Sequence, residues 1–319
     1  MPQFVFLQIV FLLCLMKSCA VATILPRRLS PSSLECFRQC PQLFKYRYVD
    51  KLPEPTSTAL ARGISAHDAL QKLFDLDPLK RTEAVLHDLF RASWSKMRKT
   101  ERYMTLFSEE ERDAEREWGL ESLALLSDYF ELESPADTHP LMREQRFTTW
   151  LATSSSGDET FPSFELVGVI DRVDRDAATG ELQIVDYKTG KAPKIEKYAL
   201  STQARIIEDK FFQLRIYALL LSRSLDELPA TLRILFLGSC EEVASVCDAK
   251  AVERTEAEVV RLWQAMNDSA TRGSFEPKEG PLCAWCHHRD KCPAFHATSL
   301  KQEQQQEVID FGALPLPPF

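Results

Sequence analysis

LQIVDYKTGKAPK, at residues 182–194, decides the fold of this chain. Its apolar residues indicate a buried strand, yet the strand ends with an acid and a base, Asp186 and Lys188. Side chains two residues apart on a strand point to the same face, so a carboxylate and an ammonium lie side by side just before a Thr-Gly turn. This pair is either a cross-strand ion pair on the surface or one half of an active site.

A second strand is predicted just upstream, for FELVGVIDRVDR at residues 164–175. The turn DAATGE joins the two strands, so they are expected to form a hairpin that brings Asp171 close to Asp186. Two neighbouring carboxylates raise one pKa unless a divalent cation lies between them, and oxygen ligands suit Mg²⁺ or Mn²⁺. Lys188 is then placed to orient an attacking water and to stabilise charge that develops on a phosphate.

Strands bracketed by helices are predicted along the rest of the chain. A helix is expected to begin after Gly63, with His67 in its first turns, and residues 82–133 have a strongly helical pattern. The remaining predicted elements are a strand at 142–151, a loop at 152–163, a helix at about 202–225, a strand pair at 230–249 and a helix at about 252–272. The predicted fold class is therefore α/β, with a helical insertion and a cysteine-rich C-terminal segment.

The motifs GVIDRVD and ELQIVDYKTGK strongly resemble the PD-(D/E)XK nucleases of the RecB exonuclease type. That family has an Asp on one strand and Asp-x-Lys on the next, commonly followed by Thr-Gly. RGISAH resembles the family's Gly-x-x-x-His helix start at His67, and FFQLRIYALLL resembles its Gln-x-x-x-Tyr motif through Gln213 and Tyr217, which share one helix face. Glu144 in MREQRF resembles an acidic position of many members. Each residue alone has an ordinary structural explanation, and it is their order and spacing that carry the resemblance.

The resemblance covers residues 29–297, with a helical insertion at about 76–135, and implies a restriction-endonuclease-like core, a mixed sheet flanked by helices. The chain is similar to stand-alone bacterial RecB-family exonucleases and to the nuclease domain of AddB. Such enzymes hydrolyse DNA phosphodiester bonds with a metal, usually from single-stranded ends, in repair or recombination. The implied metal-binding set is Asp171, Asp186, the Tyr187 carbonyl and His67. The resemblance also implies that Lys188 activates or positions the water and that Gln213 and Tyr217 hold the DNA strand or the lysine.

Nine cysteines indicate a second site. CAWCHHRDKC, residues 283–292, has the spacing C-x2-C-x5-C, which supplies three soft ligands and leaves the fourth to another part of the chain. His287 or His288 keeps a zinc site open. A disulfide framework is the alternative if the chain is secreted, but C-x2-C in a long chain with an odd cysteine count fits a metal better.

The cysteine spacing also resembles that of RecB-type nucleases with an iron–sulfur cluster. In those proteins one cysteine lies before the nuclease core in a Cys-Pro context, and three follow the core. The implied ligands of a [4Fe–4S] cluster are Cys40, Cys283, Cys286 and Cys292. Cys36, one helical turn before Cys40, is the alternative first ligand. Cys240 and Cys247 are expected to be buried strand residues, because a free cysteine commonly packs as a small hydrophobe.

The N-terminal sequence is ambiguous. FVFLQIVFLLCLM, residues 4–16, has about the length of a signal-peptide core and is too short for a membrane span of roughly 20 residues. AVA at residues 20–22 resembles a cleavage site, but no Lys or Arg precedes the apolar run, and Met16 is an alternative start. Since iron–sulfur clusters are assembled in reducing compartments, a cytoplasmic location without stable membrane association is expected. Residues 1–28 and 298–319 are expected to lie outside the nuclease domain.

The formal net charge of −8 argues against a broad basic surface that binds nucleic acid by charge alone. Basic residues still gather locally, within 38–51 and at Lys191, Lys194 and Lys197. No Gly-x4-Gly-Lys-Ser/Thr motif occurs, which excludes an ATP-driven helicase motor in these residues. The expected partners are DNA, with single-stranded ends favoured, and a separate helicase. The competing hypotheses are a non-catalytic DNA-binding scaffold that keeps the nuclease fold and a nuclease stabilised by zinc.

Overall fold

The computed structural model of the chain describes residues 23–152, 163–196 and 198–295. The described chain divides into two units. The larger unit contains Arg28–Glu35 and Glu54–Val260, and the cysteine unit takes the rest, including Cys36–Pro53 and the chain from Arg261 onward. The apolar N-terminal run, most of the loop predicted at 152–163, Lys197 and the C-terminal tail lie outside the described residues.

Helices and strands alternate along the larger unit. The strands are β1 (Arg28–Leu29), β2 (Pro140–Leu151), β3 (Phe164–Arg175), β4 (Leu182–Lys188), β5 (Pro229–Phe236) and β6 (Glu241–Val246). The helices are α4 (Thr58–Leu73), α5 (Glu83–Met97), α6 (Arg112–Leu132) and α7 (Leu200–Leu225), with short turns η2 (Pro78–Lys80), η3 (Glu109–Glu111) and η4 (Leu237–Ser239). The cysteine unit contains α3 (Pro41–Phe44), η1 (Lys45–Val49), η5 (Pro281–Trp285) and η6 (Arg289–Lys291). Two helices, α2 (Pro31–Gln39) and α8 (Ala249–Arg272), include residues of both units.

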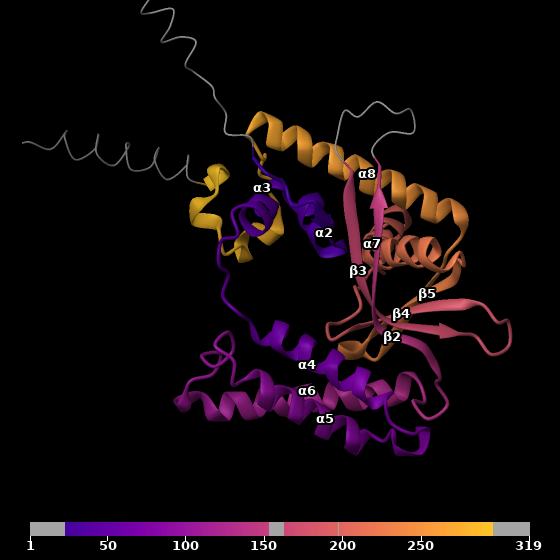
Figure 1. The fold of residues 1–319 in the computed structure, drawn as a ribbon. Coiled ribbons are helices and arrows are strands. Elements are labelled where there is room, and N and C mark those ends of the chain that lie inside the picture. The colour runs from indigo at the N-terminus through magenta and orange to yellow at the C-terminus, as the bar shows by residue number, and fades with distance from the viewer. Residues whose placement is uncertain (1–22, 153–162, 197, 296–319) are drawn as a thin grey trace, which may run out of the picture. The chain divides into compact units, whose positions relative to one another are not determined.

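The strands form one mixed sheet with the order β1-β3-β4-β5-β6, and β2 also pairs with β3. β3 is antiparallel to both β2 and β4, β4 is parallel to β5, and β5 is antiparallel to β6. The parallel step from β4 to β5 passes through α7, because parallel strands need a long crossover connection. The predicted hairpin of β3 and β4 therefore lies inside the sheet (Figure 1). The prediction of a mixed sheet flanked by helices is confirmed.

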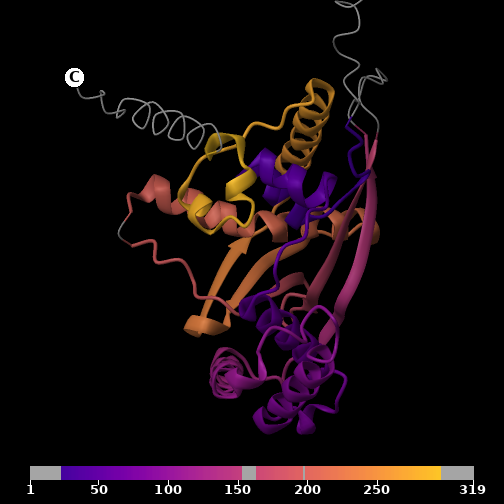
Figure 2. The same cartoon turned by 90° about the vertical axis from the view of Figure 1, so that its left-hand side faces the viewer.

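Strand β4 shows why the two faces of the sheet differ. Tyr187 packs into an apolar cluster with side chains of α4, α5 and α6. Its neighbour Lys188 points to the alternate face, where it reaches Gln213 of α7. Figure 1 and Figure 2 both show α4, α5 and α6 gathered together and away from α7. The chemistry-bearing end of β4 is thus held between two helical layers.

Helix α4 begins earlier than the sequence predicts. Ser57 accepts a hydrogen bond from the N–H of Leu60 and caps the helix, so α4 starts at Thr58 and Gly63 lies inside it. The predicted start after Gly63 is wrong, because the cap offsets the cost of about 1 kcal/mol that a glycine imposes on a helix interior. The longer helix places Leu60 and Gly63 on the same face as His67.

The segment predicted as strongly helical, 82–133, contains α5 and α6 with a break between them. The buried side chains of these two helices, among them Phe90, Trp118 and Tyr129, fill the apolar cluster beneath the sheet. Their remaining positions are largely polar, as in helices that bury one face. Within the described residues, no helix is both long and apolar enough to span a membrane.

Candidate active site

Strand register brings acidic residues from three neighbouring strands to one place. Arg172 of β3 pairs with Arg143 of β2 and with Val185 of β4. The residues one step along these ladders are Glu144, Asp171 and Asp186. An acidic position therefore occurs on each strand at the same level of the sheet.

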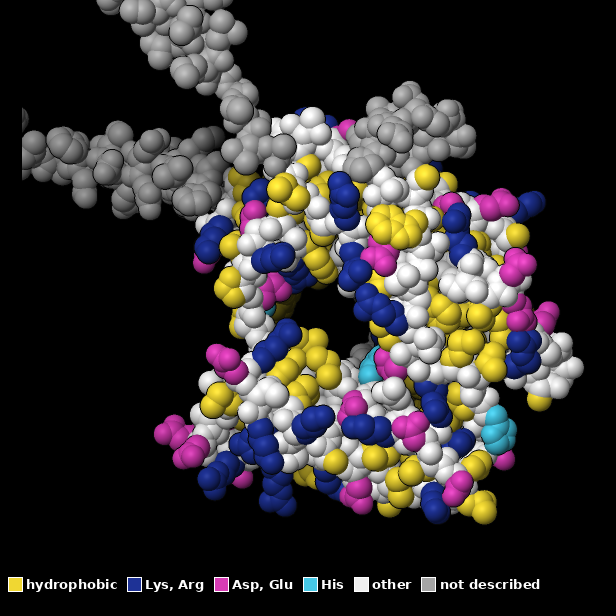
Figure 3. All heavy atoms as spheres, in the orientation of Figure 1, with side chains coloured by type: hydrophobic (Ala, Val, Ile, Leu, Met, Phe, Trp, Pro, Cys, Tyr) yellow, Lys and Arg dark blue, Asp and Glu magenta, His cyan; other side chains and the backbone are white. Residues whose placement is uncertain are grey.

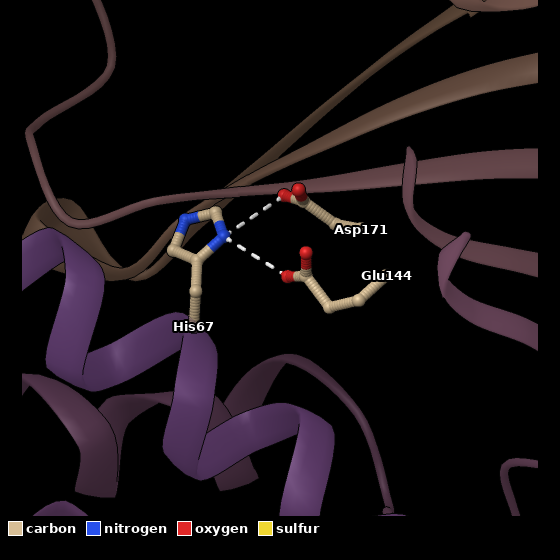
Figure 4. A group of neighbouring side chains, drawn as sticks. All are labelled: His67, Glu144 and Asp171. Atoms are coloured by element: carbon tan, nitrogen blue, oxygen red, sulfur yellow. Dashed lines mark ion pairs between the residues drawn. The ribbon is translucent and has the colours of Figure 1, made fainter. Parts of the chain in front are cut away.

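His67 on α4 points at two of these carboxylates (Figure 4). Its Nδ1 lies 3.3 Å from Oδ2 of Asp171 and 3.8 Å from Oε1 of Glu144. Ligand atoms of the three residues lie within 4.8 Å of one another, and the described chain contains no other such group of His, Cys, Asp or Glu side chains. Burial favours a neutral imidazole, but the charges and hydrogen bonds of Asp171 and Glu144 outweigh it and raise the pKa of His67 to about 10. The side chains of His67, Glu144 and Asp171 are close enough together to hold a metal ion.

The main chain of Tyr187 completes this arrangement. Its N–H donates to Oδ2 of Asp171 at 3.0 Å, and its carbonyl oxygen lies 2.9 Å from Nε2 of His67. Both ring nitrogens of His67 thus face acceptors, which suits a doubly protonated imidazole. The carbonyl predicted as a metal ligand lies at the same site as the carboxylates.

Asp186 is the most buried acid of the site, with 1% of its surface exposed. The ammonium of Lys188 forms an ion pair with its Oδ2 at 2.7 Å, whereas its buried Oδ1 has no hydrogen-bond partner in the described chain. Burial and the charge of Asp171 raise the pKa of Asp186 to about 6, against the opposing charge of Lys188. An unsatisfied buried carboxylate is costly. A divalent cation beside it would supply the missing partner.

Lys188 is connected to α7 by hydrogen bonds in series. Its Nζ donates to Oε1 of Gln213 at 2.9 Å, and Nε2 of Gln213 donates to the hydroxyl oxygen of Tyr217 at 2.6 Å. A Cβ on Gly168 of β3 would lie 2.9 Å from the ring of Tyr217, so the strand passes directly against this ring. Burial and neighbouring acids raise the pKa of Tyr217, and its hydroxyl stays protonated. Of the predicted Gln-x-x-x-Tyr pair, Gln213 thus contacts the lysine and Tyr217 contacts Gln213.

A buried arginine on the opposite face of the sheet is absent from the sequence prediction. Arg172 is 1% exposed, and its guanidinium forms ion pairs with Glu133, at the end of α6, and with Asp174 at 2.9 Å. It also donates to the hydroxyl of Tyr187 at 2.6 Å. The side chain of Tyr187 therefore contacts Arg172 on one face of the sheet, while its main chain contacts Asp171 and His67 at the candidate active site. The available signal was a charged residue inside an apolar strand, which requires a buried partner.

Two main-chain features adjoin the site. Glu144 has a φ of 44°, a left-handed conformation that is uncommon outside glycine and that concentrates at functional sites. The N–H of Gly238 donates to the carbonyl oxygen of Gly190 at 3.2 Å. A Cβ on Gly238 would lie 2.8 Å from the carbonyl oxygen of Thr189. The turn that follows Lys188 therefore packs against main chain, where only glycine fits.

The cysteine unit contains a second candidate site. A cavity of about 320 Å³ is lined by residues that include Cys40, Cys283, Cys286 and Cys292. Burial and the charges of the other three thiols raise the pKa of Cys292. The N–H of Lys278 donates to Sγ of Cys40 at 3.4 Å. Among the described residues that line the cavity, neither Cys36 nor His287 nor His288 occurs.

The prediction for the two remaining described cysteines is only partly correct. Cys247 is buried and follows the end of β6 directly. Cys240 is half-buried and lies outside the strands, where it ends η4 with a φ of 49° and donates through Sγ to the carbonyl oxygen of Asp128. The Gly-Ser pair before Cys240 turns the chain out of β5 before β6 begins.

A sequence profile of the PD-(D/E)XK nuclease superfamily matches residues 28–293 of the chain. This range includes the residues of both candidate sites. No curated protein sequence matches the chain. Among solved structures, the crystal structure of an exonuclease candidate from Eubacterium rectale has 11% sequence identity to the chain and a TM-score of 0.48, and the match covers 82% of this chain and 88% of that one.

Proposed function

Because the chain belongs to the PD-(D/E)XK nuclease superfamily, we propose that it is a metal-dependent exonuclease of the RecB type, which hydrolyses single-stranded DNA from its ends. The observation that carries the proposal is Asp186. This acid is buried beside Asp171; Lys188 pairs with its Oδ2, but its Oδ1 has no partner in the described chain. A purely structural acid at this depth would be satisfied by hydrogen bonds.

The donor set fits a hard divalent cation. The groups that would hold Mg²⁺ or Mn²⁺ are the carboxylates of Asp171, Asp186 and Glu144, the imidazole of His67 and the carbonyl of Tyr187. When bound, such an ion polarises the phosphate and makes a bound water more acidic. His67 would then give up the proton that its neighbouring acids now hold on it.

Lys188 is proposed to position the water and stabilise charge rather than to act as a base. Burial favours the neutral amine, but the charges of Asp186 and Asp171 outweigh it and raise the pKa of Lys188. An ammonium donates hydrogen bonds and has no lone pair that accepts a proton. It therefore favours the negative charge that grows on the phosphate oxygens. Gln213 and Tyr217 are proposed to orient the ammonium through their hydrogen bonds.

We further infer that the cysteine unit binds a [4Fe–4S] cluster through Cys40, Cys283, Cys286 and Cys292. In a tetrahedral zinc site, with Zn–S bonds of about 2.3 Å, the sulfurs would lie about 3.8 Å apart. In the described chain, no three of these cysteine sulfurs meet even a 4.8 Å spacing. The wider arrangement supports a cluster over a single zinc ion, and the N–H donated to the Cys40 sulfur would stabilise a thiolate ligand of either.

The test combines cleavage, metal content and one substitution. Protein purified without oxygen is expected to be brown and to degrade end-labelled single-stranded DNA with Mg²⁺ or Mn²⁺, and EDTA is expected to stop the reaction. Lys188→Ala is expected to abolish cleavage while folding and DNA binding persist. Lys250→Ala, which removes an exposed lysine at the start of α8, is the control and should cleave normally.

Each other outcome favours a different hypothesis for this protein. Cleavage by Lys188→Ala would remove the role given to the lysine. A wild-type protein that binds DNA but never cleaves it would favour the scaffold, and a colourless protein with zinc that cleaves would favour the zinc-stabilised nuclease. A separate helicase is proposed to supply the unwound strand, because these residues hold no nucleotide-binding P-loop motif.

A further inference from the structure

A groove runs along α4 and reaches the candidate metal ligands. Its volume is about 490 Å³, within the range of roughly 300–1,000 Å³ that is common for small-molecule sites. The lining residues are Ala59, Leu60, Gly63, Ile64, His67, Asp68, Gln71 and Glu144. All but Glu144 lie on one face of α4, and His67 and Glu144 belong to the metal-ligand group. We call this feature the α4 groove.

Two large apolar side chains are exposed in the α4 groove. Leu60 is 41% exposed and Ile64 is 44% exposed, and they lie one helical turn apart. Figure 3 shows hydrophobic side chains exposed over this helix. Along the helix axis, Ile64 lies about 4.5 Å and Leu60 about 10.5 Å from His67. Apolar surface is thus available within reach of the nucleotide next to a phosphate at the metal site.

Away from the metal ligands, the charge of the α4 groove disfavours direct contacts to phosphate. Among the described residues that line it there is no Lys or Arg; the charged members are the acids Asp68 and Glu144 and the imidazole of His67, which faces Glu144. Asp68 pairs with Lys72 at 2.6 Å, on the same helix. An acidic, partly apolar wall repels phosphate oxygens but accommodates the uncharged faces of a base and a sugar.

Gly63 brings the α4 groove close to the catalytic strand. A Cβ on Gly63 would lie 3.9 Å from Oγ1 of Thr189, the residue that follows Lys188. The helix face that lines the groove therefore runs directly beside the turn after the lysine. A phosphate held at Lys188 and at the acids would direct its adjoining nucleoside along this face.

We propose that the α4 groove binds the sugar and base of the nucleotide that adjoins the scissile phosphate, with Leu60 and Ile64 in contact with the base. This proposal rests on the nuclease function proposed above and specifies its substrate class. In a duplex each base is stacked and paired, so its faces are covered, whereas a single strand can offer an unstacked base to an apolar wall. The α4 groove therefore selects single-stranded DNA.

The test uses the double variant Leu60→Ser/Ile64→Ser and a control, Leu225→Ser. Leu225 is a 39% exposed leucine at the end of α7, so its substitution removes a similar exposed side chain from another helix. For cleavage of a thymidine 20-mer, the double variant is expected to have a KM about tenfold higher and a kcat little changed. The contact with the base is lost equally from the bound substrate and from the transition state. The control should match the wild type.

A second measurement requires no cleavage. Anisotropy of a labelled strand is measured with Ca²⁺ in place of Mg²⁺, for a normal oligonucleotide and for one of the same length without bases. The wild type is expected to bind the strand without bases about tenfold more weakly, and the double variant should bind both strands alike. Equal binding of the two strands by the wild type would overturn the proposal.

The two measurements separate failure of the groove from failure of the enzyme. If the wild type never cleaves but prefers the strand with bases, and the double variant does not, the nuclease function fails and the α4 groove stands. If the wild type cleaves and the double variant has the same KM, the proposal for the α4 groove is wrong. Because both replaced side chains are only 41% and 44% exposed, the double variant is expected to remain folded and to lose a small part of its stability.

Discussion

The two candidate sites differ in what holds their ligands in place. The acids and the lysine are carried by the strands β2, β3 and β4, and the histidine by the helix α4, which are packed elements of 7 to 16 residues. The cysteines are carried by short turns, since α3 has 4 residues, η5 has 5 and η6 has 3. A site built on long packed elements is formed before its metal arrives, whereas a site built on short turns depends on the bound group for its shape.

The largest effect is expected when the candidate metal site loses one negative charge and keeps its side-chain shape. Asp186→Asn is expected to lower cleavage by roughly 1,000-fold or more, because a neutral amide is a poor ligand for Mg²⁺. The same variant in EDTA should unfold at the wild-type temperature or above it, because burial and the charge of Asp171 disfavour the ionised acid despite its ion pair with Lys188. Thermal unfolding and end-labelled DNA measure both effects. Glu181→Gln, at an exposed position of the hairpin, is the matched control.

The pH dependence of stability tests the same acid. The pKa of Asp186 is raised to about 6 in the folded protein, above its ordinary value of about 4. The fold therefore favours the protonated acid, and metal-free protein should lose stability as the pH rises from about 4 to 6, on the order of 1–3 kcal/mol. This loss should be missing from Asp186→Asn. An unchanged pH profile in the variant would show that another group titrates over this range.

In the cysteine unit, unlike the candidate metal site, replacing a ligand is expected to lower the stability of the protein. Cys286→Ser is expected to lose iron and to lower the free energy of unfolding by on the order of several kcal/mol, because ligand binding and folding are coupled in such sites. Hydrogen exchange should rise around residues 36–53 and 261–295, while the sheet stays protected. The control is Cys240→Ser, whose hydroxyl can keep the hydrogen bond to Asp128. An iron-free variant of unchanged stability would show that the cysteine unit does not depend on a bound cluster for its fold.

A smaller effect is expected from the ion pair of Glu133 and Arg172, on the face of the sheet opposite the candidate active site. Glu133→Gln leaves the buried guanidinium of Arg172 with less compensating charge, which is expected to cost about 3 kcal/mol of stability. It should also lower kcat about tenfold at nearly constant KM, because the Tyr187 peptide is less firmly held. Glu242→Gln removes the partner of the more exposed Arg233 and should cost at most about 1 kcal/mol. If both variants retain full kcat, the buried ion pair has a structural role only.

The smallest effect is expected at the turn after the lysine. A methyl group at Gly238 would lie 2.8 Å from the carbonyl oxygen of Thr189, so Gly238→Ala should lose about 1–3 kcal/mol of stability. It should also weaken cleavage, because the turn after Lys188 must move. Gly119→Ala in α6, where a Cβ meets nothing within 4 Å, should stabilise the protein by about 1 kcal/mol. Chemical unfolding of the two variants compares these opposite signs.

Local spacing explains which parts of the site could be predicted from sequence. Asp186 and Lys188 share a face because strand side chains alternate, and Gln213 and Tyr217 share a face because a helix repeats about every four residues. The hairpin turn sets the register that places Asp171 beside them. These relations need only the period of each element, and they were visible in the sequence.

The rest depends on contacts between distant segments. Glu133 reaches Arg172 across 39 residues, and the approach of Gly238 to the turn at Thr189 follows from the packing of η4 against β4. The early start of α4 follows from a capping hydrogen bond that competes with the glycine inside the helix. Sequence periodicity carries no information on which distant partner a buried charge finds or where two backbones touch.

The middle residue of the Asp-x-Lys motif has a consequence for how related sequences diverge. Tyr187 serves the candidate metal site only through its peptide group, which any amino acid other than proline provides in full, while its side chain fits Arg172 and the helices behind the sheet. Evolution can therefore exchange the residue at 187 when positions 133 and 172 change with it, and leave the chemistry untouched. In a family alignment, these three columns should vary together, and the acid and lysine on either side should not follow them.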